Sequence, residues 1–533
     1  MAFIILSFFC DLCLCVLAIG VLGYLWFRHR YTYWTKKGVY GPPPTFPTGN
    51  VSDMMLRSLQ IGQQFENIYY ETRKHPFVGI YLAHKVALVV NDPELIKTIM
   101  VKDFMHFTDH GMVHNEESEP LEGHLFNING NRWRNLRVKL IPAFTSGKMK
   151  VMFDTLVHYG HIMQECIEPE IAAGNAVDMK ETLSRYTMDI VGTCVFGIET
   201  NSLKSKEPKF RIMSQKSQTL PFFRSMIQTM SLMAPWIVSR LKVSMYQNDV
   251  NQFFVEAAKD AVKYRTKENI KGNDYLQILM KLYEERQEIL KKDGKLLNKR
   301  HVYMPTDHLA AQFFVFFVDG VETSSTAASF ALFELARNPD VQKKLRDDMD
   351  DVLERHGGTF TFEALCDMKY LFQVVEEALR MYPPLPLILR VCTRDFKIPG
   401  TEVIIDKGTS VMIPTLGLHR DPDIYPNPMK FNPDRFTPEN KAQRHKFTHL
   451  PFGEGPRMCM ARLSRPITLY RCGRNGFTPG PTDPQSPTHP SFLILPRTSC
   501  HSFLLKYPPH SIPKVEGNIN IPQEKLCSSW PPI

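Results

Sequence analysis

Apolar residues fill nearly every position from Ala2 to Phe27, with Asp11 as the charged interruption. About 20 apolar residues in a helix span a bilayer, so we predict a membrane anchor over residues 1–27. Basic residues gather at positions 28–37, and the positive-inside rule then keeps the rest of the chain on the cytosolic side. No small-residue cleavage motif follows the apolar run, which favours an anchor that is retained.

Beyond the anchor, the hydrophobic pattern predicts one mostly helical body. Residues 28–50 combine basic residues with Gly-Pro-Pro-Pro at 41–44, and proline stiffens the backbone, so we expect a basic, Pro-rich linker. Helix-length patterns dominate residues 51–463, with strand-like runs at 79–90 and 394–413. This pattern predicts a mainly α fold with small β-sheets and one domain.

Three further segments are informative. The polar stretch 264–305 surrounds the apolar block DYLQILMKLY, which predicts a helix. The apolar region 220–241 is interrupted by Arg224 and Pro235, and it is either a helix pair covering the core or a surface patch that dips into a membrane. From Ser464 onward about one residue in five is proline, so we expect residues 464–533 to be a poorly ordered tail.

Charge and cysteine content narrow the functional classes. The formal charge of +9 over 533 residues is too diffuse for nucleic acid and fits an anionic membrane surface or an acidic partner. Eleven cysteines without regular spacing favour a reducing compartment over a disulfide framework. Cys10, Cys13 and Cys15 lie inside the anchor, where lipid-facing packing is a simpler interpretation than a metal or redox role.

The segment PFGEGPRMCMA, residues 451–461, carries the clearest chemistry. A cysteine binds iron as a thiolate, whose charge is stabilised by backbone N–H donors in a tight turn. Gly453 and Gly455 allow the backbone to close around Cys459, and Arg457 is spaced to pair with a carboxylate of a bound macrocycle. The alternative is a buried free cysteine after a Gly-Pro turn.

This segment resembles the haem-binding loop of the cytochrome P450 superfamily, F-x-x-G-x-R-x-C, beginning at Phe452. Four further motifs follow the family's order: Trp133 and Arg137 of W-x-x-x-R, the stretch Gly320-Val321-Glu322-Thr323-Ser324 of the long central helix, Glu377 and Arg380 of E-x-x-R, and Arg435 of a segment similar to P-E-R-F. Each motif alone is weak, but five in order over roughly 400 residues form a specific pattern.

The runs 121–153, 195–204 and 316–346 resemble the insect microsomal family 6 more closely. The resemblance implies the cytochrome P450 fold, one haem b and anchoring in the endoplasmic reticulum membrane. It implies a monooxygenase that inserts one atom of O2 into lipophilic small molecules. The electrons are expected to come from NADPH through NADPH–cytochrome P450 reductase, with cytochrome b5 as a further candidate partner.

The same resemblance assigns cofactor contacts to side chains. Cys459 is expected to be the axial iron ligand, in a loop that begins with Phe452. Trp133, Arg137 and Arg457 are expected to hold haem propionates. Arg390 is either a further propionate partner or a surface-facing strand arginine, because its position after an apolar run fits both.

Proton delivery and a structural ion network are the next expectations. Glu322 and Thr323 place an acid beside an alcohol, which suits the transfer of protons to a bound peroxide, and Gly320 is expected to loosen the helix there. The alternative is an ordinary polar helix face. Glu377 and Arg380 share a helix face at i, i+3, and the resemblance implies that Arg435 joins them in a buried structural network.

The resemblance also predicts an apolar substrate pocket, suited to lipophilic molecules. Its candidate contacts are Phe107, Phe126, Phe313, Phe317, Val321 and Leu387. Phenylalanine at helical spacing is equally typical of a plain core, which stays open as the alternative. His106, His110 and His114 recur every fourth residue, but the intervening residues disfavour a helix, so we expect a polar loop and not a zinc site.

The chain departs from the family pattern in three places. Asp319 stands where the family carries a small residue, and burial there is expected to raise its pKa or to crowd the oxygen site. Ala461 replaces a glycine. The tail after Leu463 replaces a helix that the family packs along the haem, so we expect weakened folding or haem binding. Two alternatives to a monooxygenase follow, a haem-thiolate isomerase or dehydratase and a non-enzymatic product of an aberrant transcript.

Overall fold

The computed structural model describes residues 2–55, 59–112, 115–116, 119–219, 222–233, 237–238, 240, 244–270, 272, 274–292 and 305–460. The predictions for Ala461, for Leu463, for the tail 464–533, for Pro235 and for His114 therefore lie outside the described residues.

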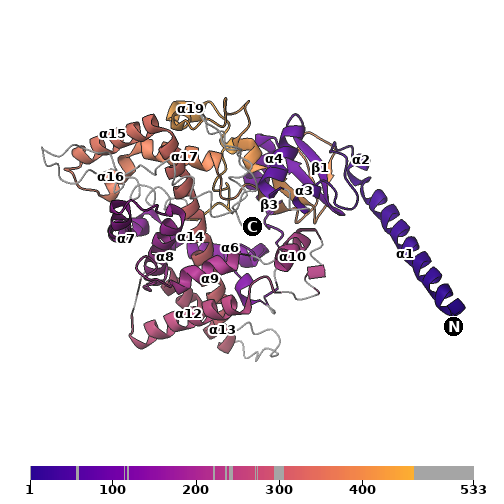
Figure 1. The fold of residues 1–533 in the computed structure, drawn as a ribbon, viewed down its shortest axis with the longest axis horizontal. Coiled ribbons are helices and arrows are strands. Elements are labelled where there is room, and N and C mark those ends of the chain that lie inside the picture. Colours follow the sequence, from indigo (N-terminus) through magenta and orange to yellow (C-terminus); the bar gives the residue numbers. More distant parts are fainter. Residues whose placement is uncertain are drawn as a thin grey trace.

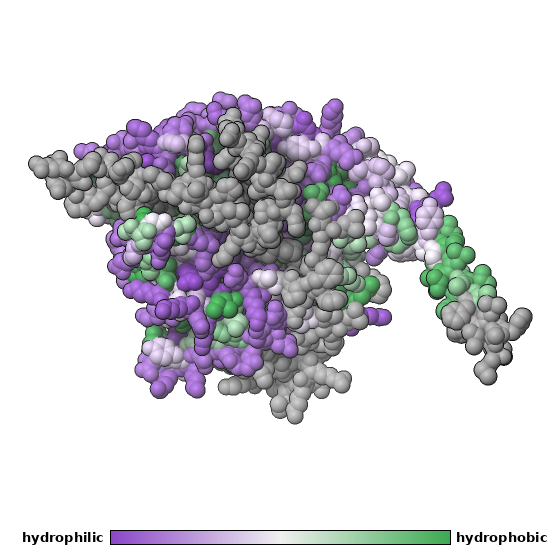
Figure 2. Space-filling model, in the orientation of Figure 1, coloured by the Kyte–Doolittle hydropathy of each residue, from purple (hydrophilic) through white to green (hydrophobic). Residues whose placement is uncertain are grey.

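The apolar N-terminus forms one helix, α1 (Ala2–Arg30). It projects from the body as an isolated rod whose described surface is strongly hydrophobic (Figures 1 and 2). The segment Cys10–Lys36 is long and apolar enough to cross a membrane, and none of its window is buried inside the protein. These properties agree with the predicted anchor.

Residues 31–50 pack on the body instead of spanning a gap. Within α2 (Tyr33–Lys36), Trp34 is buried and its indole N–H donates to the carbonyl of Ile80 at 3.1 Å. The ring covers Gly79, where an added Cβ would lie 2.2 Å from it. The segment expected as a linker thus packs against the sheet, because Gly79 has no side chain and leaves room for the indole of Trp34.

The main sheet has four strands in the order β1-β2-β6-β3. Its strands are β1 (Phe77–Leu82), β2 (Lys85–Val90), β3 (Ile388–Val391) and β6 (Ser410–Ile413), and β4 (Phe396–Lys397) pairs separately with β5 (Ile404–Ile405). The β1–β2 hairpin is antiparallel, β2 and β6 run parallel, and β3 closes the sheet antiparallel to β6. Both strand-like runs of the sequence are therefore confirmed as strands.

Helices make up most of the remaining body. The longer ones are α4 (Ile61–Thr72), α6 (Gly130–Leu140), α7 (Ser146–Ala172), α8 (Met179–Val191), α9 (Lys209–Gln218), α10 (Phe222–Met233), α12 (Asn248–Lys267), α13 (Tyr275–Lys292), α14 (Pro305–Arg337), α15 (Pro339–Arg355) and α17 (Lys369–Met381). Short elements are α3 (Ser52–Met55), α5 (Pro93–Lys97), α16 (Phe362–Asp367), α18 (Thr415–His419), α19 (Pro438–Ala442), the π-helical turns η1 (Thr98–Lys102) and η5 (Gly192–Phe196), and the 3-10 turns η2 (Phe104–His106), η3 (Pro120–Glu122), η4 (Ile141–Phe144), η6 (Pro433–Phe436) and η7 (Lys446–Thr448). The helix predicted at DYLQILMKLY is confirmed as part of α13.

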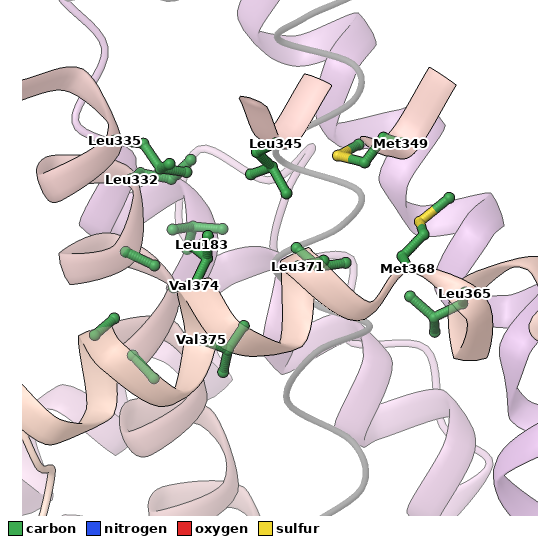
Figure 3. Packing of buried hydrophobic residues seen from close by; sticks show 14 of the residues in the cluster. Leu183, Leu332, Leu335, Leu345, Met349, Leu365, Met368, Leu371, Val374 and Val375 are labelled. Atoms are coloured by element: carbon green, nitrogen blue, oxygen red, sulfur yellow. The ribbon is translucent and has the colours of Figure 1, made fainter. Parts of the chain in front are cut away.

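The long helix α14 runs through the middle of the body, and its two halves pack differently (Figure 1). Its C-terminal half contributes Leu332 and Leu335 to an aliphatic core shared with α8, α15, α16 and α17 (Figure 3). Its N-terminal half packs against α12 and α13 through aromatic rings. The α-helix continues without a break through Gly320, so the local loosening expected there is not observed.

Candidate active site

The loop that carries Cys459 is closed by its own backbone. The Cys459 N–H donates to the carbonyl of Phe452 at 2.9 Å, and the Met458 N–H donates to the carbonyl of Gly455 at 3.0 Å. Gly453 and Gly455 have φ values of +64° and +77°, which glycine adopts without strain. At Gly455 a Cβ would lie 2.0 Å from the carbonyl oxygen of Met100 in η1, so a side chain there would displace the loop.

Helix α6 brings two side chains beside this loop. Arg137 donates to the carbonyl of Met458, and its guanidinium lies 5.8 Å from the ring centre of Trp133. On the same indole, the guanidinium of Arg457 lies 4.1 Å from the ring centre, within the range of a cation–π contact. The two motifs W-x-x-x-R and F-x-x-G-x-R-x-C are therefore joined through one aromatic ring.

Arg457 and Arg390 are both deeply buried. Arg457 donates to the carbonyls of Thr108, Phe126 and Ile128 at 2.7, 3.3 and 3.0 Å. Arg390, on β3, donates to the carbonyl of Leu389, while its Nε is buried without a hydrogen-bond partner in the described structure. The backbone therefore satisfies most of the donors of Arg457 but leaves Arg390 incompletely satisfied.

The electrostatics of the arginine cluster, Arg137, Arg390 and Arg457, indicate a missing negative charge. Burial lowers the pKa of Arg390 to about 10, and repulsion by Arg137 adds to the shift. Burial also lowers the pKa of Arg457 to about 9, assisted by repulsion from Arg390. Asp109 lies 3.9 Å from Arg457, too far for a hydrogen bond. An anion with two carboxylates, such as haem with its two propionates, fits this cluster beside a cysteine thiolate.

Comparisons with known proteins agree with this geometry. A family model described as Cytochrome P450 matches residues 43–462. The chain belongs to the cytochrome P450 family. Among its relatives, this P450 is 39% identical to Cytochrome P450 6a2 of Drosophila melanogaster over 448 residues, which cover 83% of this chain and 87% of the relative. It is 38% identical to Cytochrome P450 6k1 of Blattella germanica, over 85% of this chain and 87% of the relative.

Membership of the family establishes the fold, the haem cofactor and the activity of a monooxygenase. In cytochromes P450, the cysteine thiolate that binds the haem iron donates electron density to it, which favours cleavage of the O–O bond. The family normally works with a redox partner and with lipophilic substrates.

The side chains of the predicted ion network, Glu377, Arg380 and Arg435, lie together in the structure. Arg380 donates to both carboxylate oxygens of Glu377 at 2.7 and 2.8 Å, and both residues are fully buried. Arg435 approaches the same carboxylate at 3.4 Å. Arg380 also donates to the carbonyls of His419 and Pro428. The network therefore ties α17 to the segment that leads into the Cys459 loop.

His419 is a residue that motif reasoning missed. Its Nε2 accepts the N–H of Leu450 at 2.8 Å, so the ring is neutral and its other nitrogen carries the proton. Burial lowers the pKa of His419 to about 3, with repulsion by Arg380 adding to the effect. Leu450 immediately precedes the loop, so His419 links it to the ion network. No local signal in the sequence marks this histidine.

Glu322 and Thr323 are neighbours on α14 with different surroundings. Glu322 accepts from Lys180 at 2.6 Å and from Arg211 at 2.5 Å. Burial alone would raise the pKa of Glu322, but these two cations lower it overall. Thr323 instead donates its hydroxyl to the carbonyl of Asp319 at 2.6 Å, one turn earlier. The acid and the alcohol do not bond to each other, and their joint role stays a prediction.

Asp319 shares the helix face of Thr323 and has an exposed side chain, although it lies in the middle of the body. Its side chain therefore reaches solvent although protein atoms lie close around it. Burial raises the pKa of Asp319 to about 7, in the direction expected from the sequence.

The predicted substrate contacts do not gather in one place. Phe313, Phe317 and Val321 form an i, i+4, i+8 stripe that is fully buried against helical neighbours. Phe317 stacks on Phe196, and Phe313 lies tilted against the same ring. Phe107 packs on Phe396, and Leu387 packs in a core cluster beneath the sheet. Phe126 is partly exposed, with its ring 4.4 Å from that of His110. Contact of any of these residues with substrate stays a prediction.

Two of the three histidines considered for zinc, His106 and His110, lie in the described structure and have different surroundings. His106 belongs to the short turn η2, and His110 contacts the carbonyl of Phe126 through Nδ1 at 3.0 Å. Within the described ranges, no group of three or more His, Cys, Asp or Glu residues could hold a metal ion.

Proposed function

We propose that this P450 binds haem b through Cys459 as the axial iron ligand and oxidises lipophilic small molecules, including xenobiotics. The observation that carries the proposal is the arginine cluster beside the Cys459 loop, in which three cations lie together and Asp109 approaches one of them, Arg457, at 3.9 Å. Arg137, Arg390 and Arg457 would hold the propionates. The indole of Trp133 would keep the guanidinium groups of Arg137 and Arg457 in position through cation–π contacts. When bound, the haem supplies the activation of O2.

The residues of α14 would manage protons. The Thr323 hydroxyl donates to the carbonyl of Asp319, so it would have to rotate away from that oxygen before it could pass a proton toward the haem site. Lys180 and Arg211 keep Glu322 ionised, so Glu322 would have to take up a proton from solvent before it could pass that proton on. Glu377, Arg380 and Arg435 would keep the Cys459 loop in position without touching the reacting atoms.

The electrons would come from NADPH through NADPH–cytochrome P450 reductase, with cytochrome b5 as a further donor. The anchor α1 would hold the chain in the endoplasmic reticulum membrane with the body in the cytosol, because basic residues end this helix. A reaction that requires NADPH distinguishes this proposal from a haem-thiolate isomerase or dehydratase, which acts on a preformed peroxide.

The test compares Cys459→Ser with Cys366→Ser in full-length, haem-reconstituted protein. Cys366 is an exposed free cysteine on α16 and serves as the matched control. We expect the reduced, CO-bound Soret band of thiolate-ligated haem in the wild type and in the control but not in Cys459→Ser. NADPH-dependent substrate oxidation with added reductase should follow the same order. Loss of the band in both variants, or in neither, contradicts the proposal.

A further inference from the structure

His110 lies beside the arginine cluster, although no sequence motif assigns it a role there. Its Nδ1 lies 3.0 Å from the carbonyl oxygen of Phe126, and Nη1 of Arg457 donates to the same oxygen at 3.3 Å. The imidazole is partly buried and packs on the Phe126 ring, with 4.4 Å between the ring centres. One backbone oxygen therefore holds the imidazole next to a member of the cluster.

The bond to Phe126 determines what the other ring nitrogen can do. A carbonyl oxygen only accepts, so Nδ1 of His110 carries a hydrogen. In a neutral ring Nε2 is then an acceptor, and it becomes a donor only when the ring takes up a proton. Among the described residues, Nε2 has no hydrogen-bond partner. His110 can therefore hold an anion through Nε2 only in its cationic form.

The charges around His110 keep the ring neutral in the chain alone. Burial lowers the pKa of His110 well below its usual value, and repulsion by Arg390 of β3, by Arg457 and by Arg137 of α6 adds to the shift. Asp109, the preceding residue, accepts from a hydroxyl and from a backbone N–H through one carboxylate oxygen. The cluster therefore consists of three guanidinium groups with one neutral imidazole among them.

A haem propionate at this cluster would change the state of His110. A negative charge within about 4–6 Å of a titratable group favours its cationic form, which opposes the repulsion by the three arginines. A carboxylate oxygen is also the acceptor that Nε2 needs, and a hydrogen bond between two charged groups is stronger than one between neutral groups. Both effects favour a protonated His110 when the propionate is bound.

We propose that His110 holds a haem propionate as an imidazolium, donating from Nε2, and that it takes up a proton from solvent when haem binds. The inference rests on the proposed function, because it requires haem at the Cys459 site. An N–H bond forms at Nε2 and water supplies the proton, while the three guanidinium groups keep their charge. The haem-loaded chain then binds more protons than the haem-free chain, so haem should be held more tightly as the pH falls through the range in which His110 titrates.

The test follows the transfer of haem from the full-length, haem-loaded chain to an excess acceptor between about pH 6 and about pH 8, around the titration range of histidine. His110→Gln replaces the ring by an amide that donates without titrating, and His110→Arg supplies a permanent cation. The matched control is His106→Gln, because the His106 ring lies outside the cluster, 3.5 Å from the carbonyl of Arg394. The reduced-CO band of thiolate-ligated haem is recorded first for each protein, as a measure of haem ligation that needs no turnover.

We expect the wild type and the control to lose haem about tenfold faster at about pH 8 than at about pH 6, because deprotonation of His110 removes a charged hydrogen bond. His110→Arg should lose haem slowly at both pH values, and the rate for His110→Gln should lack this step. Titration of the remaining groups is common to all four proteins, so the difference between their profiles reports His110.

Parallel profiles of the wild type and His110→Gln overturn the proposal, while the CO band shows that the haem site itself is intact. Loss of the band in both His110 variants overturns it too, since the ring would then be needed for its fit to Phe126 and not for its charge. Loss in His110→Gln alone supports it, because the permanent cation restores binding. Absence of the band in the wild type contradicts the proposed function, and this inference falls with it.

Discussion

Two buried arginine clusters in this P450 differ in how their charge is balanced. In one, the Glu377 carboxylate accepts two hydrogen bonds from Arg380 and lies 3.4 Å from Arg435, so a carboxylate of the fold lies between the two cations. In the other, Arg390 and Arg457 lie beside Arg137, and the distance from Arg457 to Asp109 is 3.9 Å. Burying an ion costs several kcal/mol, so we expect the first cluster to be stabilised by its own carboxylate and the second by an anion from outside the chain.

The comparison separates two roles that one residue type can take. Arginine in a closed network holds backbone segments together, and removing its partner leaves a charge stranded in the core. Arginine in an open cluster repels its neighbours until the anion arrives. Substitutions in the two clusters should therefore have opposite effects on the chain without haem.

The largest effect is expected from Glu377→Gln. The neutral amide leaves Arg380 buried and uncompensated, which should cost about 3–5 kcal/mol of unfolding free energy with or without haem. Denaturant unfolding measures the change. The control is Asp347→Asn, which removes an exposed i, i+4 pair with Lys343 and should cost well under about 1 kcal/mol. Equal stability of the two variants would show that the buried network is not closed as described.

Arg390→Met should act in the opposite direction on the haem-free chain. Removing one of the repelling cations should leave that chain as stable or more stable, while haem dissociates about ten- to a hundredfold faster, since a charged hydrogen bond contributes about 1.5–3 kcal/mol. Haem transfer to an excess acceptor measures the rate. Arg394→Met, at an exposed position on the same connection, should change neither property. A haem-free Arg390→Met chain as unstable as Glu377→Gln would remove the distinction between the clusters.

His419 predicts a pH dependence of intermediate size for the closed network. Its folded pKa of about 3 lies below the ordinary value near 6.5, so between these values the unfolded chain binds more protons. Stability should therefore fall as the pH is lowered from about 6.5. In His419→Gln the amide oxygen can accept from Leu450 without titrating, so this part of the acid sensitivity should disappear. Unfolding midpoints measured between pH 5 and pH 7, about the titration range of histidine, test this expectation, with His356→Gln at a partly exposed position as the control.

Asp319→Asn should give the smallest effect, with the reverse sign. The folded pKa of Asp319 is raised to about 7, so between its ordinary value and 7 the folded chain binds more protons than the unfolded chain. Wild-type stability should therefore decrease relative to the asparagine variant as the pH rises toward 7. Contact of the side chain with solvent should keep the difference small. Parallel unfolding curves at all pH values would contradict the shift.

The parts of the fold that local pattern could predict were the anchor, the hairpin run 79–90 and the helix in 274–283, since each reflects a repeat of apolar positions. The packing of residues 31–50 was not predictable in the same way. Trp34 is buried only because Gly79, on a strand much later in the sequence, leaves space for it. Proline content indicates stiffness but not the surface on which a stiff segment lies.

The candidate site shows a similar division. Cys459, Arg137, Arg457 and the Glu377–Arg380 pair were identified because fixed spacing carries their chemistry. The stripe Phe313, Phe317 and Val321 lies on one helix face, but spacing does not specify what a face contacts, and here other helices cover it. His419 escaped notice because its partners are backbone groups at distant positions.

The indole of Trp34, seated on Gly79, has a mechanical consequence for the whole enzyme. Because α2 is fixed to the sheet directly after α1, the proposed membrane anchor would not be a free tether. If α1 spans the bilayer, the tilt of the body above it would be determined by the angle at which α1 leaves the sheet (Figure 1). Any substrate dissolved in the lipid would therefore approach the protein from a constant direction.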